Sequence, residues 1–137
     1  MKGIYVLIIQ LNKNINLTIG KLGKISFPKG LYAYVGSAQT NLEKRIARHY
    51  RKEKQTFWHI DYLLQNPNTK IVKTFFKTSQ KTEECAIANK IADKSKIIVN
   101  FGCSDCKCNT HLFQVNDYDF LREFMKEYTL PKVSIVS

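Results

Sequence analysis

The chain has 137 residues, of which 44% are apolar and 24% charged, and it carries a formal net charge of +11. This length suits one domain around one core, and the apolar content excludes a disordered chain. No apolar run approaches the roughly 20 residues that a membrane span requires, so we expect no membrane contact. Segment 1–9 is apolar but short, and no small-residue cleavage site follows it. This favours a buried strand over a signal peptide, and a cytoplasmic location.

The positive charge is concentrated in the N-terminal half of the chain. Residues 1–60 hold eleven Lys and Arg against two acids, a net +9. Residues 61–115 hold eight against five, a net +3, and residues 116–137 hold three against four, a net −1. Each cation that reaches a phosphate releases counterions, so such a distribution favours a nucleic-acid partner. The alternative is a chain that is simply rich in lysine, but that bias would spread the charge more evenly.

Hydrophobic periodicity and turn residues predict alternating strands and helices. In the first half we expect a strand at 4–11, a hairpin at 15–19 and 24–27, a strand at 31–36, a helix from Asn41 to about 51 and a short helix within 56–64. In the second half we expect a strand at 71–76, a helix from Thr82 to about 94 and short strands at 97–99 and 112–115. A final amphipathic helix should begin at Asn116 or Asp117 and bury Phe120, Leu121, Phe124 and Tyr128.

These elements predict a single α/β (α+β) domain over residues 1–137. We expect a small central, mostly antiparallel sheet flanked by helices, with an extra N-terminal hairpin. The core should span about 3–95, with 96–137 packed on it as a C-terminal extension.

The helix expected at 41–51 turns one apolar stripe toward the core. Arg45 and His49 stand at the border of this stripe, and Arg48 and Lys52 lie further round.

Two tripeptides stand on the two expected core strands, Gly3-Ile4-Tyr5 on the first and Tyr34-Val35-Gly36 on the second. Ser37 follows the second tripeptide, Arg45 lies on the next helix, and His49 lies one turn further on. This ordered set resembles the GIY-YIG nuclease superfamily, over roughly residues 3–95.

A closer resemblance, over almost the whole chain, is to an uncharacterised branch of that superfamily, sometimes fused to endonuclease III-type DNA glycosylases. It rests on segments 20–23, 27–30, 32–38, 48–49, 58–64, 84–85 and 104–112. The sequence departs from the better-known nucleases in two ways. Residues 12–30 form an insertion between the tripeptides, and aligning Glu84-Cys85 with the usual Glu-Ala pair puts Asn89 where the metal-binding glutamate usually stands.

The resemblance implies a metal-dependent DNA endonuclease that hydrolyses phosphodiester bonds in DNA repair or processing. Such hydrolysis requires an activated water, neutralisation of the charge on the phosphate and usually a metal on the leaving oxygen. The resemblance assigns catalytic roles to Tyr5, Tyr34, Arg45 and His49, and the position of Glu84 on its helix adds Glu84 as a further catalytic candidate.

In this scheme Tyr5, with Tyr34 beside it, is a general base or proton shuttle. A phenol titrates near 10, so only about 0.1% is phenolate at neutral pH, and a neighbouring cation or metal-bound water must share the work. Arg45 clamps the phosphate, and His49 relays a proton. Without the resemblance, strand packing explains the tyrosines and a solvated helix face explains Arg45.

The basic half and the resemblance together imply nucleic-acid contacts from Gly36, Ser37, Lys44, Arg48, Lys52 and His59. The expected partner is DNA, with RNA as an alternative, and a DNA glycosylase is a candidate protein partner. Two other functions stay open: an inactive nucleic-acid-binding module of the same fold, and an interaction subunit of a repair enzyme.

Glu84 is notable because the helical wheel places it with Ile87, Ala88 and Ile91 in the middle of an apolar face. A carboxylate there is costly unless it is paired or bound to a metal. One interpretation is a frayed helix end that lets Glu84 reach solvent. The others are a bond to Arg45, His49 or His59, or a site for Mg²⁺ or Mn²⁺ with Glu84 as the metal ligand. For His59 and Asp61, beside Trp58, support of the site and capping of a structural helix stay equally open.

Without a secretory signal, the four cysteines are expected to be reduced thiols or metal ligands, with Cys85 in the core. Cys103, Cys106, Cys108 and His111 suggest a zinc site by residue type. The Cys-x-Cys step is cramped, so we expect a tight turn at Asp105 and no stoichiometric zinc.

Overall fold

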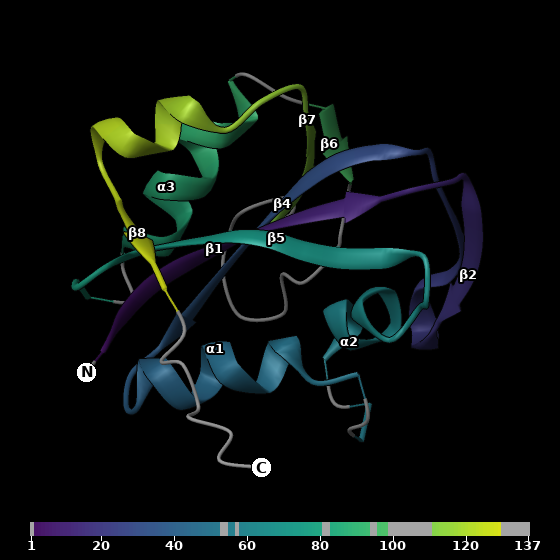
Figure 1. Cartoon of the computed structure of the whole chain (residues 1–137), viewed down its shortest axis with the longest axis horizontal. Helices are drawn as coiled ribbons and strands as arrows, with labels where there is room; N and C mark the ends of the chain where they lie inside the picture. Colours follow the sequence, from purple (N-terminus) through teal and green to yellow (C-terminus); the bar gives the residue numbers. More distant parts are fainter. Residues whose placement is uncertain are drawn as a thin grey trace, which may run out of the picture.

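The computed structural model of the chain describes residues 2–52, 55–56, 58–80, 83–93, 96–98 and 111–129. Its centre is a six-stranded sheet in the order β6-β7-β4-β1-β5-β8, with every neighbouring pair antiparallel (Figure 1). The strands are β1 (Gly3–Leu11), β4 (Gly30–Ala38), β5 (Thr69–Lys77), β6 (Lys96–Ile98), β7 (Leu112–Val115) and β8 (Lys126–Tyr128). The helices are α1 (Leu42–Tyr50), α2 (His59–Leu64) and α3 (Glu83–Ala92), with 3-10 turns η1 (Gly20–Leu22) and η2 (Asp119–Glu123).

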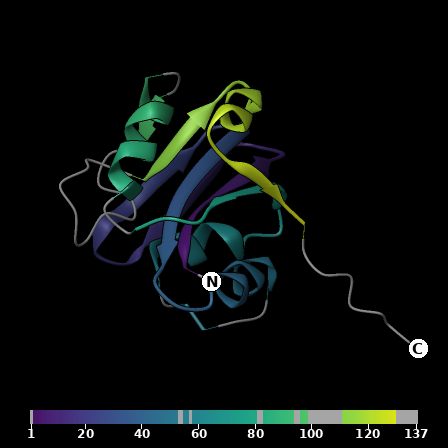
Figure 2. The same ribbon diagram turned by 90° about the vertical axis from the view of Figure 1, so that its left-hand side faces the viewer.

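Helices cover both faces of this sheet. Figures 1 and 2 show α1 and α2 on one face and α3 with η2 on the other. Side chains of β1 alternate between the two sides: Tyr5 and Leu7 join the core with α1 and α2, whereas Ile4 and Val6 join the core with α3. A strand buried on both faces needs a continuous apolar run, which explains why the expected strand at 4–11 has one. The expected α+β class, with a sheet flanked by helices, is confirmed.

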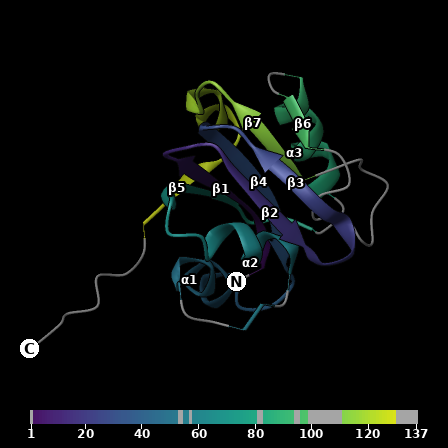
Figure 3. The same ribbon diagram turned by 90° about the vertical axis from the view of Figure 1, so that its right-hand side faces the viewer.

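The insertion between the two tripeptides forms the expected hairpin, β2 (Ile15–Ile19) paired with β3 (Gly23–Phe27). Figure 3 shows this hairpin beside the central sheet. Ile19 and Phe27 are fully buried in the core that also contains α2. The insertion therefore adds a second small sheet without separating β1 from β4, which pair along their whole length.

The α1 helix begins as expected at Asn41, whose side chain accepts a hydrogen bond from the Lys44 N–H at 3.3 Å. Its buried residues are Leu42, Ile46 and His49. The expectation that His49 stands at the border of the apolar stripe is therefore wrong, because a strand residue inside the core supplies its hydrogen-bond partner.

The expected C-terminal helix is also wrong. The chain forms the short turn η2 and then β8, which pairs with the edge of β5. A free strand edge presents unpaired backbone groups, and β8 satisfies those of β5. Leu121 and Met125 enter the core with α3, while Tyr128 packs edge-on against Phe76 with ring centroids 5.7 Å apart. Apolar residues with helix-like spacing are thus buried by a turn and a strand.

Thr82, the expected N-cap of α3, lies outside the described residues. Of the helices that the structure does describe, none is long and apolar enough to cross a membrane.

Candidate functional site

The two tripeptides meet where Tyr5 of β1 lies directly opposite Gly36 of β4. A Cβ built on Gly36 would stand 2.4 Å from Cζ and Oη of Tyr5, so the phenol ring occupies the space above this glycine. Gly3 is equally confined, since its Cβ would lie 2.3 Å from the Lys77 carbonyl oxygen of β5. Both glycines are therefore required by close packing around Tyr5 and the strand that carries it.

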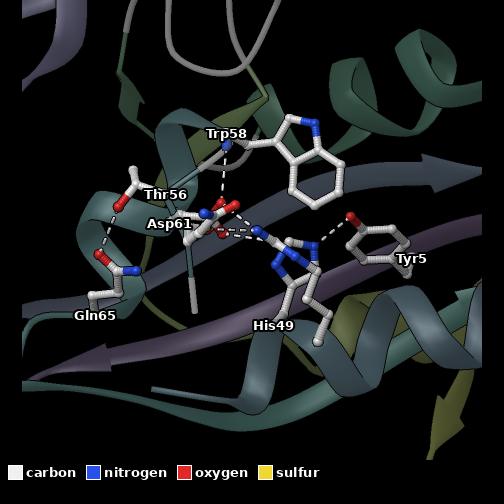
Figure 4. Close-up of polar contacts among 8 residues, drawn as sticks. Tyr5, His49, Thr56, Trp58, Asp61 and Gln65 are labelled. Atoms are coloured by element: carbon white, nitrogen blue, oxygen red, sulfur yellow. Dashed lines mark hydrogen bonds and ion pairs between the residues drawn. The ribbon is translucent and has the colours of Figure 1, made fainter. Parts of the chain in front are cut away.

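A buried hydrogen bond joins the Tyr5 hydroxyl to His49 Nε2 at 2.7 Å (Figure 4). Each residue is only 2% exposed. The His49 ring lies among three aromatic rings, with centroids 5.4 Å from Tyr5, 6.2 Å from Tyr34 and 5.7 Å from Trp58. The α1 helix and the sheet thus hold an imidazole and a phenol at proton-transfer distance.

Arg45 brings a positive charge to this pair. Its guanidinium donates to the Ser37 carbonyl oxygen at 3.0 Å and lies over the Trp58 ring. Burial raises the pKa of the Tyr5 phenol, while Arg45, by its charge and a side-chain hydrogen bond, lowers it. Burial also raises the pKa of Tyr34, an effect that Tyr5 increases and Arg45 opposes. The net direction is upward for both, so the phenols are protonated at neutral pH.

Glu84 of α3 stands on the far side of β4 from α1 yet acts on the same phenols: its negative charge raises the pKa of both Tyr5 and Tyr34. It is 8% exposed and lies on the buried side of α3, as the helical wheel predicts, so the frayed-helix interpretation is wrong. Ser37 Oγ donates to Oε1 at 2.9 Å, and His111 Nδ1 lies 3.0 Å from Oε2.

These partners of Glu84 differ from the three proposed from sequence, which were Arg45, His49 and His59. His111 reaches Glu84 because it directly precedes β7, and its carbonyl oxygen accepts a hydrogen bond from the Val35 N–H of β4 at 2.9 Å. No spacing along the chain signals this contact.

Of the two candidate metal ligands on α3, Glu84 and Asn89, only Glu84 lies on the buried side of the helix. Asn89 is exposed, and five helical residues place it about 140° round α3 from Glu84. Within the described residues, no three His, Cys, Asp or Glu side chains gather as a complete metal cage. Mg²⁺ does not require one, because it commonly uses one or two carboxylates and completes its shell with water and phosphate oxygens. Both Glu84 oxygens already have a partner, Ser37 or His111, so a Mg²⁺ ion would share one of these oxygens with that partner.

Two residues expected to contact nucleic acid bond the protein instead. Arg48 Nη1 and Nη2 each donate to the Asp61 carboxylate at 3.0 Å. Lys52 Nζ donates to the carbonyl oxygens of Leu64, Asn66 and Thr69 at 2.7, 2.9 and 2.7 Å. Lys52 also donates to the Thr69 hydroxyl at 3.1 Å, and partial burial lowers its pKa. Both cations join α1 to the segment that begins with α2.

The outer side of α1 has a depression of about 560 Å³. It is lined by Thr40, Asn41, Lys44, Arg45, Ala47, Arg48 and Arg51. Lys44 and Arg51 are exposed, and Arg45 connects this hollow to Tyr5. Sequence reasoning missed Arg51, although its spacing of seven from Lys44 puts both on one side of the helix.

The other predicted contacts lie at the margin of the site. Gly36 is buried under Tyr5, and Ser37 is half-buried and bonds Glu84. His59 begins α2 and is half-buried; the residue of this segment that reaches His49 is its neighbour Trp58.

The cysteine expectations have two outcomes. Cys85 is half-buried and in a disulfide, so the expectation of a reduced core thiol is wrong for this residue. Cys103, Cys106 and Cys108, the zinc candidates, lie outside the described residues together with Asp105.

The fold and this cluster define a small α+β domain in which a core strand and α1 hold a buried Tyr–His pair beside an arginine, with a buried glutamate across the sheet. Residues 4–132 match the family described as "Domain of unknown function DUF123", and the chain belongs to this family. No curated protein matches the chain. No solved structure matches it either.

Proposed function

We propose that this chain is a metal-dependent endonuclease that hydrolyses phosphodiester bonds in DNA, with the catalytic arrangement of the GIY-YIG superfamily that its tripeptides resemble. The observation that carries the proposal is the buried Tyr5–His49 hydrogen bond of 2.7 Å with Arg45 beside it. Both side chains are almost completely buried, which suits moving a proton from a water rather than forming a covalent bond with DNA.

The raised pKa of Tyr5 determines how the proton moves. Because the phenol is protonated at neutral pH, it cannot begin as a phenolate base. It takes the proton of the attacking water as its own proton passes to Nε2 of a neutral His49. The water oxygen bonds to phosphorus, the bond to the leaving oxygen breaks, and Arg45 stabilises the charge that develops on the phosphate. Mg²⁺, held by Glu84, would neutralise the leaving oxygen.

The hollow on α1 supports DNA as the substrate. Lys44 and Arg51 extend the positive surface away from Arg45, so a strand whose phosphate meets Arg45 would place neighbouring phosphates along α1. A role in DNA repair or processing, and a glycosylase partner, rest on the resemblance alone.

A buried carboxylate that acts electrostatically on both phenols from the other side of β4 favours an enzyme over the inactive binding module, since DNA binding alone does not require one. The test uses plasmid, branched and single-stranded DNA with Mg²⁺ or Mn²⁺. Tyr5→Phe should reduce cleavage by about 10²–10⁴-fold, and Arg45→Ala by about 10²–10³-fold. Tyr118→Phe, on the opposite face of the sheet, is the matched control.

If the wild-type protein binds these DNAs but cuts none of them with either metal, the enzyme proposal fails. The binding module is then the correct function.

A further inference from the structure

Trp58, the only tryptophan of the chain, links the groups that the proposed reaction uses. Its ring lies 4.6 Å from Arg45 Cζ and 4.5 Å from Arg48 Cζ. Its centroid is 5.7 Å from that of His49, at an interplanar angle of 42°. Figure 4 shows the indole on the same side of the sheet as His49 and the Tyr5 hydroxyl. One residue from outside α1 thus contacts three side chains of that helix.

Asp61 holds the backbone of Trp58 in place. Asp61 is completely buried, and its carboxylate accepts a hydrogen bond from the Trp58 backbone N–H at 2.9 Å. The same carboxylate accepts hydrogen bonds from both terminal nitrogens of Arg48, whose guanidinium lies over the Trp58 ring. Asp61, Arg48 and Trp58 therefore form a closed set of contacts that joins α1 to α2.

The position of His49 depends on this set. Two of the rings around His49, Tyr5 and Tyr34, come from the sheet, whereas Trp58 is the N-cap residue of α2. Without the indole, the imidazole is no longer enclosed on the α2 side, and the 2.7 Å bond to Tyr5 loses its lateral support. Arg45 loses its cation–π contact and keeps its bond to the Ser37 carbonyl oxygen.

We propose that Trp58 is a positioning residue, which holds His49 on the Tyr5 hydroxyl and Arg45 beside the phosphate site, and that Asp61 positions Trp58. This inference rests on the proposed endonuclease function for its kinetic consequences. The set of contacts also gives Arg48 and Asp61 a shared role. Arg48, a cation on the basic helix, pairs with the buried acid Asp61 because together they hold Trp58 in place.

The experiment compares Trp58→Leu with Trp58→Phe and with a control, Tyr62→Leu, which removes a half-buried ring from the same helix. Trp58→Leu should lower kcat by about 10²-fold, the effect of displacing reacting groups by about 1 Å, and change KM much less. Trp58→Phe keeps a ring against His49 and should retain most of kcat, and Tyr62→Leu should retain all of it. If Trp58→Leu does not fold, Trp58→Met, with a more adaptable unbranched side chain and no ring, takes its place.

Two readouts on the DNA-free protein separate this inference from the proposed function. Trp58→Leu should weaken the bond between His49 Nε2 and Tyr5 and so change the nitrogen NMR signal of Nε2 by far more than the loss of the neighbouring ring current alone, whereas Tyr62→Leu should not change it. Asp61→Asn should shift the emission of the single tryptophan to longer wavelength, because Trp58 becomes more solvated. If the wild-type protein cuts no DNA, the proposed function is wrong, but the two measurements on the DNA-free protein still test the position of His49. Unchanged His49 signals and unchanged kcat in Trp58→Leu overturn the positioning role.

Discussion

Gly36→Ala is the substitution whose effect follows most directly from the geometry. The new Cβ would lie 2.4 Å from both Cζ and Oη of Tyr5, whereas ordinary contact begins at 3.4 Å, so the ring must move by about 1 Å. Gly36 does not have a positive φ, so the effect comes from this collision and not from backbone strain. We expect a loss of about 1–3 kcal/mol in the free energy of unfolding, which is typical of overpacking. We also expect cleavage to fall by about 10²-fold as Tyr5 leaves His49.

Urea unfolding and DNA cleavage measure the two effects separately. Gly23→Ala is the control, because its Cβ meets nothing within 4 Å while its φ of 76° strains any other residue. It should lower stability by about 1 kcal/mol and leave cleavage unchanged. Adding Tyr5→Leu to Gly36→Ala removes the colliding atoms and should make the two stability losses less than additive. A Gly36→Ala protein as stable as the wild type would refute the packing argument.

Three further predictions concern charged and titratable groups. Lys52→Met should lower the free energy of unfolding by about 1–3 kcal/mol, because it leaves carbonyl oxygens unsatisfied. Arg51→Met should lower it by under about 0.5 kcal/mol and should instead weaken DNA binding. Urea unfolding and binding titrations measure the two effects. Folding raises the pKa of Tyr5, so the contribution of the protonated phenol to the free energy of unfolding is complete below pH 10, about the pKa of a tyrosine in the unfolded chain. This contribution is lost as the pH rises above that value. Tyr5→Phe should therefore reduce the loss of stability at alkaline pH. Glu84→Gln should reduce cleavage, with partial rescue by excess Mg²⁺ or Mn²⁺; lower stability with unchanged metal dependence would instead assign Glu84 a purely structural role.

Much of the fold was predictable because local patterns determine it. The uninterrupted apolar run at 4–9 required a strand buried on both faces, and Asn41 marked the start of α1. The segment after 116 was not predictable in the same way. Phe120, Phe124 and Tyr128 have helical spacing, but the free edge of β5 competes for the chain and is satisfied by β8. Such tertiary competition leaves no local signal in the sequence.

The candidate site, like the fold, was only partly predictable from the sequence. Tyr5, Tyr34 and Arg45 could be proposed from the ordered motifs, and Glu84 from its place on an apolar helix face. In the structure Arg45 lowers and Glu84 raises the pKa of both phenols. The contact between His111 and Glu84 could not be proposed, because the pairing of β7 with β4 creates it.

The net charge of the first 60 residues overstates the positive surface that DNA can meet. Arg48 is neutralised by the buried Asp61, and Lys52, two residues beyond α1, bonds four protein acceptors. These two cations therefore connect α1 and the residues after it to α2 and the segment that follows α2. Around the hollow this leaves Lys44, Arg45 and Arg51. If these three neutralise phosphates, the logarithm of the binding constant should fall with the logarithm of salt concentration with a slope of about −2.7. A slope near −8, as all nine net charges of the N-terminal segment would give, would mean that DNA contacts extend well beyond α1. Arg51→Met should then reduce the slope by about 0.9, while Arg48→Met should lower stability because it leaves the Asp61 carboxylate buried without its cation.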